Sequence, residues 1–194
     1  MQNIQPNHLL NAYCQGVFPM ADDDGTIYWY DPDPRAILPL DYFHIPRRLA
    51  RTVKSGQFEV KFDTAFRRVM ELCAAPRPGH DATWISDDII NVYTELHEAG
   101  FAHSVETWQG DRLVGGLYGV SICGLFAGES MFSRQRDASK VALVHLVAHL
   151  RVQGFTLLDT QFNTPHLSRF GVIEIPRNDY KMRLDGALRV AARF

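Results

Sequence analysis

The second half of the chain shows first the alternation that is typical of strands and then the spacing of a helix. Alternating apolar and polar positions predict strands over residues 103–108, 112–122 and 125–131, with turns between them that contain glycine. Apolar residues three and four positions apart then predict a helix that begins with Asp137 as its N-cap and ends near Gln153. This region is therefore expected to be an antiparallel meander followed by a helix.

The same patterns predict shorter elements in the rest of the chain. Strands are expected at residues 58–62, 155–158 and 172–175, and helices at 6–14, 46–54, 63–74, 86–100 and 178–190, with a further helical turn around His166. Asp63 and Ser86 are the expected N-caps of two of these helices. Residues 18–33 are predicted to be a loop-rich, extended stretch, and the proline-rich residues 76–81 a break in the chain.

This order of elements predicts an α+β fold and not a regular βαβ repeat. It resembles the core of the N-acetyltransferase superfamily. We expect a small N-terminal domain over residues 1–62 and an acetyltransferase-like (GNAT-like) C-terminal domain over residues 63–194.

Composition narrows the class of protein. Hydrophobic residues make up 46% of the 194 residues and charged residues 22%, which is typical of a globular chain. The formal net charge of -2 does not indicate a nucleic-acid binder, although a local basic face is compatible with it. The three cysteines lack disulfide or metal spacing and the N-terminus lacks a secretory signal, so a reduced, cytoplasmic chain is expected. No stretch approaches the roughly 20 apolar residues of a membrane span.

Glu129 is the first candidate for a functional group. Its neighbours Phe126, Met131 and Phe132 are large and apolar, and a carboxylate among such groups needs a partner or a task. A solvent-facing charge on a strand is the alternative, and the site role is favoured. The adjacent Ser130 nearly completes a hydrolase nucleophile elbow, but Phe132 stands where that motif needs its second glycine.

Asp159 and Gln161 are the second candidates. They follow an apolar strand, where catalytic groups are common but turns and helix caps are equally so. Two residues apart on an extended chain, their side chains are expected on the same side. A carboxylate beside an amide can orient it and accept protons through it.

Three other patterns have simpler interpretations. His145 and His149 have the spacing of a zinc pair, but the glutamate of the zincin motif and a third ligand are lacking, so no metal is expected. Residues 133–140 open a helix without the glycine-rich turn that binds CoA, which argues against that cofactor. The basic residues at the 46–54 helix predict a solvated face, with phosphate binding as the alternative. These residues are Arg47, Arg48, Arg51 and Lys54.

The motifs, taken in order, resemble the leucyl/phenylalanyl-tRNA–protein transferase family over nearly the whole chain. The matching segments are residues 12–19, 29–35, 83–85, 103–106, 113–119, 128–133, 138–140, Asp159 with Gln161, His166, and 174–177. The chain departs from the family at Met20, where a tryptophan is usual, and near Asn163, where the usual asparagine is displaced. Family members often carry further N-terminal residues, so the resemblance implies a short first domain.

The resemblance implies an activity. Such an enzyme moves leucine or phenylalanine from charged tRNA to the α-amino group of a protein that begins with Arg or Lys, and the product is directed to degradation by the N-end rule (N-degron) pathway. The resemblance implies no metal and no CoA, and a cytoplasmic protein; a monomer is the default expectation. The alternatives are a CoA-dependent N-acetyltransferase and a tRNA-binding module without catalysis.

The resemblance also implies roles for individual residues. Asp159 and Gln161 would handle the proton of the attacking amine, and Glu129 would lie near the 3′ adenosine and the aminoacyl ester. The basic helix, first interpreted as a solvated face, would bind the tRNA acceptor stem. The aminoacyl pocket and 3′ adenosine site would be formed by Met20, Trp84, Tyr93, Leu117, Phe126, Leu146 and Leu158.

Overall fold

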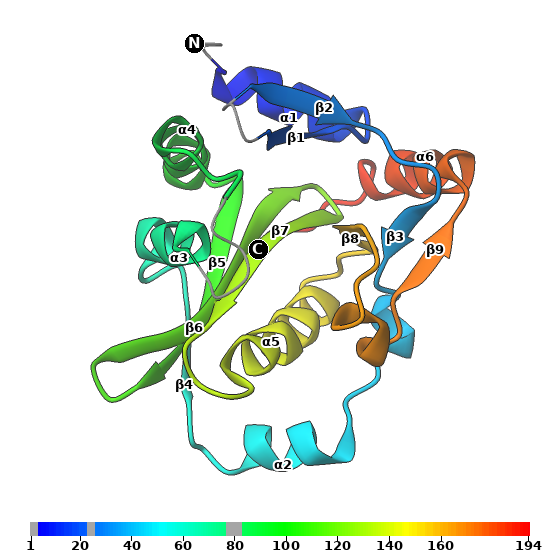
Figure 1. Cartoon of the computed structure of the whole chain (residues 1–194). Coiled ribbons are helices and arrows are strands. Elements are labelled where there is room, and N and C mark those ends of the chain that lie inside the picture. Colours follow the sequence, from blue (N-terminus) through cyan, green and yellow to red (C-terminus); the bar gives the residue numbers. More distant parts are fainter. Residues whose placement is uncertain (1–3, 23–25, 77–82) are drawn as a thin grey trace.

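A seven-stranded mixed sheet organises the structure, a computed structural model that describes residues 4–22, 26–76 and 83–194 (Figure 1). The strands lie in the order β4-β5-β6-β7-β8-β3-β9, and all neighbours are antiparallel except β7 and β8. They are β3 (Arg35–Ile37), β4 (Glu59–Phe62), β5 (Ala102–Gln109), β6 (Arg112–Ile122), β7 (Leu125–Ser133), β8 (Leu157–Gln161) and β9 (Ile173–Ile175). A separate antiparallel hairpin pairs β1 (Phe18–Ala21) with β2 (Ile27–Tyr30).

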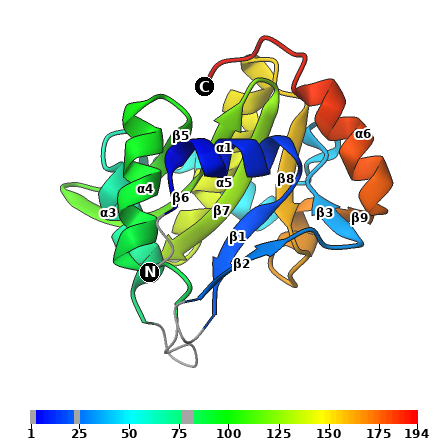
Figure 2. The ribbon, with the colours of Figure 1, turned by 90° about the horizontal axis from the view of Figure 1, so that it is seen from above.

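Helices cover both faces of this sheet. They are α1 (Pro6–Cys14), α2 (Arg47–Lys54), α3 (Phe66–Ala74), α4 (Asp87–Glu98), α5 (Ala138–Val152) and α6 (Arg177–Ala187), with short 3-10 helices η1 (Leu40–Tyr42) and η2 (Leu167–Phe170). Helix α5 packs on one face, and α3 and α4 pack on the other (Figure 1). Seen from above, α1 crosses the sheet beside the β1–β2 hairpin, and α6 lies next to β3 and β9 (Figure 2). None of the described helices is long and apolar enough to cross a membrane.

The two faces hold separate hydrophobic cores. One is centred on α5, with Leu146 and Leu150 almost fully buried. The other joins α1, α3 and α4, and includes Tyr13 and Tyr93. The sheet therefore separates two apolar layers, and a group at its middle can reach both.

Strands β7 and β8 separate shortly after they meet. Their parallel pairing ends at Ala127 and Asp159, although β7 continues to Ser133 and β8 to Gln161. On its other side, β7 pairs Gly128 with Gly119 and Ser130 with Tyr118, so Glu129 is the extra residue of a β-bulge. A bulge bends its strand and re-aims a side chain, and such features are common next to active sites.

Glycines permit this geometry. A Cβ at Gly119 would lie 2.3 Å from the carbonyl oxygen of Ala127 and 2.4 Å from the ring of Phe126, so only glycine fits opposite the bulge. A Cβ at Gly115 would lie 2.5 Å from the Cβ of Ala138, so glycine lets the start of α5 approach β6.

The structure confirms the predicted α+β class, the meander of β5, β6 and β7, and the helices of both halves. The division at residue 62 stays a prediction; β3 and β4, from the first range, are strands of the main sheet. Apart from Pro76, the expected break at 76–81 lies outside the described residues.

Several local predictions were wrong. Part of the loop-rich stretch forms β1 and β2, because hairpin pairing satisfies its extended backbone. The predicted 155–158 strand begins at Leu157 and continues to Gln161, because β3 pairs with its polar end.

Two predicted caps also differ. Asp63 has a φ of 57°, and its carboxylate accepts from the Ser104 amide at 2.8 Å, while Ala65 occupies the N-cap position of α3. Asp137 stands at the N-cap of α5, but its carboxylate binds Lys140 at 2.7 Å and makes no capping hydrogen bond. Ser86 does cap α4, accepting from the Ile89 amide at 3.4 Å.

Candidate active site

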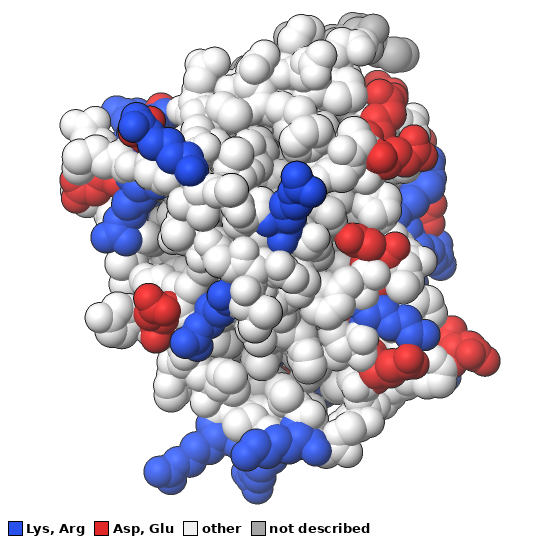
Figure 3. Space-filling model, turned by 180° about the vertical axis from the view of Figure 1, so that it is seen from behind, with Lys and Arg blue, Asp and Glu red and all other residues white. Residues whose placement is uncertain are grey.

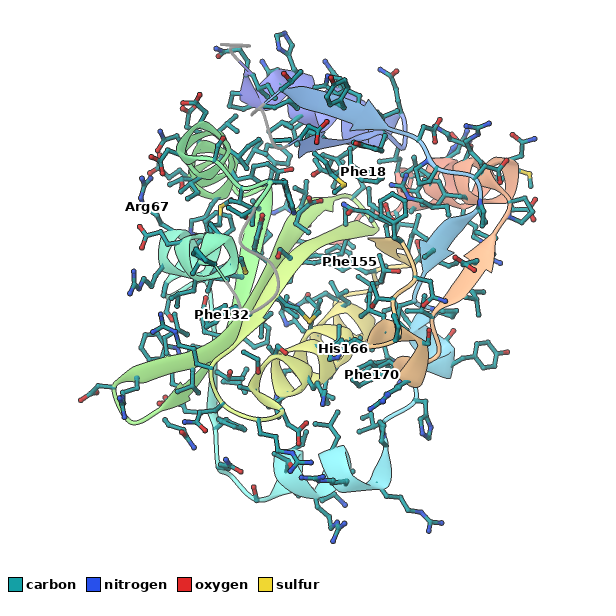
Figure 4. All side chains as sticks on the ribbon, viewed as in Figure 1. Phe18, Arg67, Phe132, Phe155, His166 and Phe170 are labelled. Atoms are coloured by element: carbon teal, nitrogen blue, oxygen red, sulfur yellow. The ribbon has the colours of Figure 1, made fainter. Side chains whose placement is uncertain are left out.

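A cavity of about 720 Å³ opens where β7 and β8 separate. Its walls come from both hydrophobic cores and from the first turn of α5. In Figure 4, Phe132 of β7 and His166, next to η2, mark two of the elements that border it. The lining residues that matter below are Met20, Trp84, Leu117, Tyr118, Glu129, Met131, Leu143, Leu146, Leu158, Thr160 and Gln161.

Glu129 is held in this cavity through one of its two carboxylate oxygens. Its Oε1 accepts from the Tyr13 hydroxyl at 2.7 Å and from Nε2 of Gln161 at 2.9 Å. Its Oε2 is buried and has no hydrogen-bond partner among the described residues. A buried polar atom without a partner is rare, so Oε2 is available for a ligand.

Burial governs the charge of Glu129. Loss of water around the carboxylate raises its pKa to about 8, against the opposing hydrogen bond from Tyr13. Asp159 also contributes to this rise in the pKa, while Arg35 and Gln161 oppose it. A carboxyl group with this pKa is mostly protonated at pH 7 and ionised above pH 8, which suits a group that exchanges protons near neutrality.

Gln161 reaches Glu129 from an unusual backbone conformation. Its φ is 64°, in the left-handed region that residues other than glycine seldom adopt. Its backbone amide donates to Oδ1 of Asp159 at 2.8 Å, which stabilises this turn. The turn directs the Gln161 side chain into the cavity, where its Nε2 donates to Glu129.

Asp159 forms a buried ion pair with Arg35. Nε of Arg35 lies 3.0 Å from Oδ1 and Nη2 lies 2.6 Å from Oδ2, and both side chains are 1% exposed. The Tyr180 hydroxyl also donates to Oδ2 at 2.8 Å. Asp159 is not among the residues that line the cavity. These contacts of Asp159 fix the position of Arg35 and stabilise the turn at Gln161.

Arg35 connects this pair to the N-terminal segment. Its Nη1 donates to the carbonyl oxygen of Gly16 at 3.0 Å. Its guanidinium lies 4.6 Å from the ring centroid of Phe18 and 4.4 Å from that of Tyr180. These contacts hold the end of α1 and the start of β1 beside β8 and α6.

Unpartnered polar atoms gather at the cavity. Seven buried side-chain polar atoms have no hydrogen-bond partner among the described residues. Four of them belong to residues that line the cavity, namely Tyr118, Glu129, Thr160 and His166. Because native proteins satisfy buried polar groups, this concentration indicates a ligand with several polar groups.

Most residues of the predicted aminoacyl pocket line the cavity. These are Met20, Trp84, Leu117, Leu146 and Leu158. Two others lie behind its wall. Tyr93 is buried against Tyr13, and Phe126 is buried in the α5 core against Phe194.

Sequence reasoning gave no role to Arg35 or to three further groups at this site. Tyr13 was included in a matching segment but was given no role. Arg136 and Lys140 line the cavity near the start of α5. A basic pair next to a helix N-terminus was the available signal for the last two; for Tyr13, no local signal marks a partner 116 residues away.

The four basic residues of α2 lie outside the cavity on one exposed helix. Arg47, Arg48, Arg51 and Lys54 are all exposed, while Leu49 is buried against the α5 core. None of the four forms an ion pair with a residue that the structure describes. In Figure 3, basic side chains gather at the lower edge, the end of the molecule where α2 lies in Figure 1.

The chain is similar to one protein family along most of its length. The sequence profile described as leucyl/phenylalanyl-tRNA protein transferase matches residues 37–185, and the profile of that family's N-terminal domain matches residues 2–33. A leucyl/phenylalanyl-tRNA–protein transferase of Phenylobacterium zucineum is 59% identical over 196 residues, covering 100% of this chain and 89% of the relative. One of Herpetosiphon aurantiacus is 57% identical over 194 residues, covering 100% and 99%.

Similarity to solved structures is weaker. The structure of L-PGS from Bacillus licheniformis has a TM-score of 0.40 and 12% sequence identity, covering 70% of this chain and 49% of that one. A TM-score of this size is too low to assign the fold.

We expect Asp159→Asn to lower the free energy of unfolding by about 3–5 kcal/mol, because it leaves the buried Arg35 charge without its partner. Urea unfolding measures this change. The matched control is Asp185→Asn, which removes the exposed pair with Arg189 and should change stability little. Equal effects of the two variants would contradict the structural role of Asp159.

Proposed function

The chain belongs to the leucyl/phenylalanyl-tRNA–protein transferase family, and we propose that it moves Leu or Phe from charged tRNA to proteins that begin with Arg or Lys. It is therefore an aminoacyltransferase that acts on aminoacyl-tRNA and protein. The observation that carries the proposed chemistry is the Glu129 carboxylate, held at one oxygen and unpartnered at the other, inside a cavity with apolar walls. CoA-dependent acetyl transfer, the alternative, is not favoured by the names of the relatives.

The cavity suits an apolar aminoacyl group. Leu117, Leu146 and Leu158 provide an apolar wall, and Met131 and Leu143 extend it. Such a wall accepts Leu and Phe and disfavours charged side chains, which would lose their hydration. A small difference in apolar size costs only about 1–3 kcal/mol, so Met would be a weaker donor and would not be excluded.

Glu129 is the proposed proton acceptor, with Gln161 orienting the amine. The neutral α-amino nitrogen attacks the ester carbonyl carbon, and the bond from that carbon to the 3′ oxygen of the tRNA breaks. The nitrogen loses a proton to Oε2 of Glu129, which can return it to the departing 3′ oxygen. Because Gln161 donates through Nε2, its carbonyl oxygen is left to accept a hydrogen bond from the amine. Asp159, which accepts four hydrogen bonds from Arg35, Tyr180 and the Gln161 amide, supports Gln161 in this scheme.

The basic face of α2 is the proposed contact for the acceptor stem of the tRNA. Its exposed cations can neutralise phosphates without reading sequence. Helix α2 packs against α5, whose first turn borders the cavity. The pKa of Asp137, at this edge, is lowered mainly by its hydrogen bond from Lys140, with Arg48 of α2 a weaker cause. A stem on α2 would therefore have its 3′ end within reach of the cavity.

Several broader features belong to the same proposal. We propose a GNAT-like C-terminal domain, which the separation of the parallel strands β7 and β8 supports, and a boundary near residue 62. The segment 133–140 contains no glycine, which argues against CoA in this opening. We also propose a cytoplasmic enzyme that acts as a monomer where charged tRNA is present; the cysteines that the structure describes form no disulfide, as is usual in a reducing compartment.

The overall reaction is tested with labelled Leu-tRNA and two peptides that differ only in their first residue, Arg or Ala. We expect label on the Arg peptide at a rate at least about tenfold higher, because a site that pairs a substrate cation discriminates strongly against its absence. Equal labelling of both peptides would contradict the proposed acceptor, and acetylation of either by acetyl-CoA would support the alternative.

Glu129→Gln should reduce transfer by about 10²–10⁴-fold while tRNA binding stays unchanged, because the amide cannot accept the proton. The pH dependence gives the sharper test. Wild-type kcat/KM requires an ionised Glu129, with a pKa of about 8, and a neutral acceptor amine, so its logarithm should rise with a slope near 2 well below pH 8. In the variant only the amine titrates, and the slope should fall to about 1. An unchanged slope would exclude Glu129 as the base.

The double variant Arg47→Gln/Arg51→Gln should weaken tRNA binding and make its dependence on salt less steep, with the slope of log K against log salt reduced by about 1–2. The measurement is filter binding between low and moderate salt. Arg183→Gln/Arg189→Gln removes two exposed cations from the region of α6, far from α2 in Figure 1, and serves as the control. Equal losses from both pairs would indicate only a general charge effect.

A further inference from the structure

Two buried tyrosines connect α1 and α4 to the Glu129 carboxylate. The hydroxyls of Tyr13, on α1, and Tyr93, on α4, lie 2.5 Å apart. The Tyr13 hydroxyl also lies 2.7 Å from Oε1 of Glu129, in the bulge of β7. The two tyrosines are 2% and 0% exposed, so both hydroxyls are shielded from bulk solvent. Three elements far apart in the sequence therefore meet in one chain of hydrogen bonds.

The direction of this chain follows from the number of protons. A tyrosine hydroxyl has one proton to donate and lone pairs to accept. Because Tyr13 donates its proton to Glu129, Tyr93 must donate to Tyr13. The hydroxyl of Tyr13 is thus polarised by a donor behind it, and successive hydrogen bonds of this kind strengthen one another.

We propose that Tyr13 and Tyr93 are positioning residues that hold the Glu129 carboxylate in place and favour its ionised form during transfer. This inference rests on the proposed role of Glu129 as the proton acceptor. Tyr13 and Gln161 together occupy Oε1 and fix the plane of the carboxylate. Its other oxygen, Oε2, is then left for the amine. The site is incomplete without α1, which lies in the segment matched by the N-terminal profile.

The tyrosines do not themselves exchange protons with the substrate. Burial and the nearby Glu129 carboxylate raise the pKa of Tyr13 and of Tyr93 well above the usual value. Both therefore remain protonated donors throughout the working pH range. Neither lines the cavity, so both act through Glu129.

Other charged and titratable groups also face Glu129. Asp159 on β8 opposes its ionisation, and Arg35 on β3 favours it. Tyr118 on β6 is a further buried tyrosine, whose hydroxyl has no hydrogen-bond partner among the described residues. Asp159 and Arg35 neutralise each other as a pair, so the Tyr13 hydrogen bond is the main contact that favours the ionised form.

The test is the pH profile of kcat/KM for Tyr13→Phe, which keeps the ring and removes only the hydroxyl. Loss of a hydrogen bond to a charged group should reduce transfer about tenfold or more at pH 7. The deficit should shrink as the pH rises above the pKa of Glu129 in the variant, because the carboxylate is then ionised without help. Tyr42→Phe, at a tyrosine that is 82% exposed, is the matched control and should retain the wild-type profile.

Tyr93 supplies a second, independent measurement. Tyr93→Phe should shift the profile in the same direction by less, because Tyr13 still donates to Glu129. The double variant Tyr13→Phe/Tyr93→Phe should lose less than the sum of the two single losses, since Tyr93 contacts the Tyr13 hydroxyl that donates to Glu129. Urea unfolding of all three variants confirms that each is folded at the assay temperature.

The outcomes distinguish a failure of the hydrogen-bond relay from Tyr93 through Tyr13 to Glu129 from a failure of the proposed function. A wild-type profile for Tyr13→Phe, or a loss that is equal at every pH, overturns the relay and leaves Glu129 as the base if Glu129→Gln reduces the slope. Additive losses in the double variant also overturn it. If Glu129→Gln leaves the slope unchanged, the proposed base is wrong and the relay falls with it.

Discussion

The buried pair of Arg35 and Asp159 is the interaction on which the site depends. Two charges taken out of water need close geometry and further hydrogen bonds, and here Gly16, Tyr180 and the Gln161 amide supply them. The pair joins β3 to β8 and ties the end of α1 to both. Without it, the left-handed turn at Gln161 would lose its acceptor, and α1 would lose one of its connections to the main sheet.

This anchoring explains how a small N-terminal segment reaches the cavity in the main sheet. Helix α1 delivers Tyr13 to Glu129, while the neighbouring hairpin delivers Met20 to the cavity. The β-bulge and the separation of β7 from β8 occur at the same place, so the carboxylate is presented where the sheet opens. Burial there raises the pKa of Glu129 into the range of an α-amino group.

The sequence predicted much of the fold because its patterns are local. Strands β5 to β7 alternate, and α5 shows helical spacing, so their existence followed from residues close together in the chain. The sequence did not predict β3, whose pairing partners are distant in the chain. This strand has only three residues and forms because it pairs with β8 and β9. Nothing in the sequence indicated the ion pair of Asp159 either, because its partner Arg35 lies 124 residues away.

By itself, the sequence determined the family, the α+β class and the candidates Glu129, Asp159 and Gln161, because ordered motifs and local periodicity are written in the chain. Only the tertiary structure decided where those candidates lie and which partners they contact. It placed Glu129 and Gln161 in the cavity and Asp159 in an ion pair, and it brought Tyr13 to the carboxylate. The physical reason is that burial and hydrogen-bond partners set the charge and availability of a carboxylate, and both arise from residues that are distant in sequence.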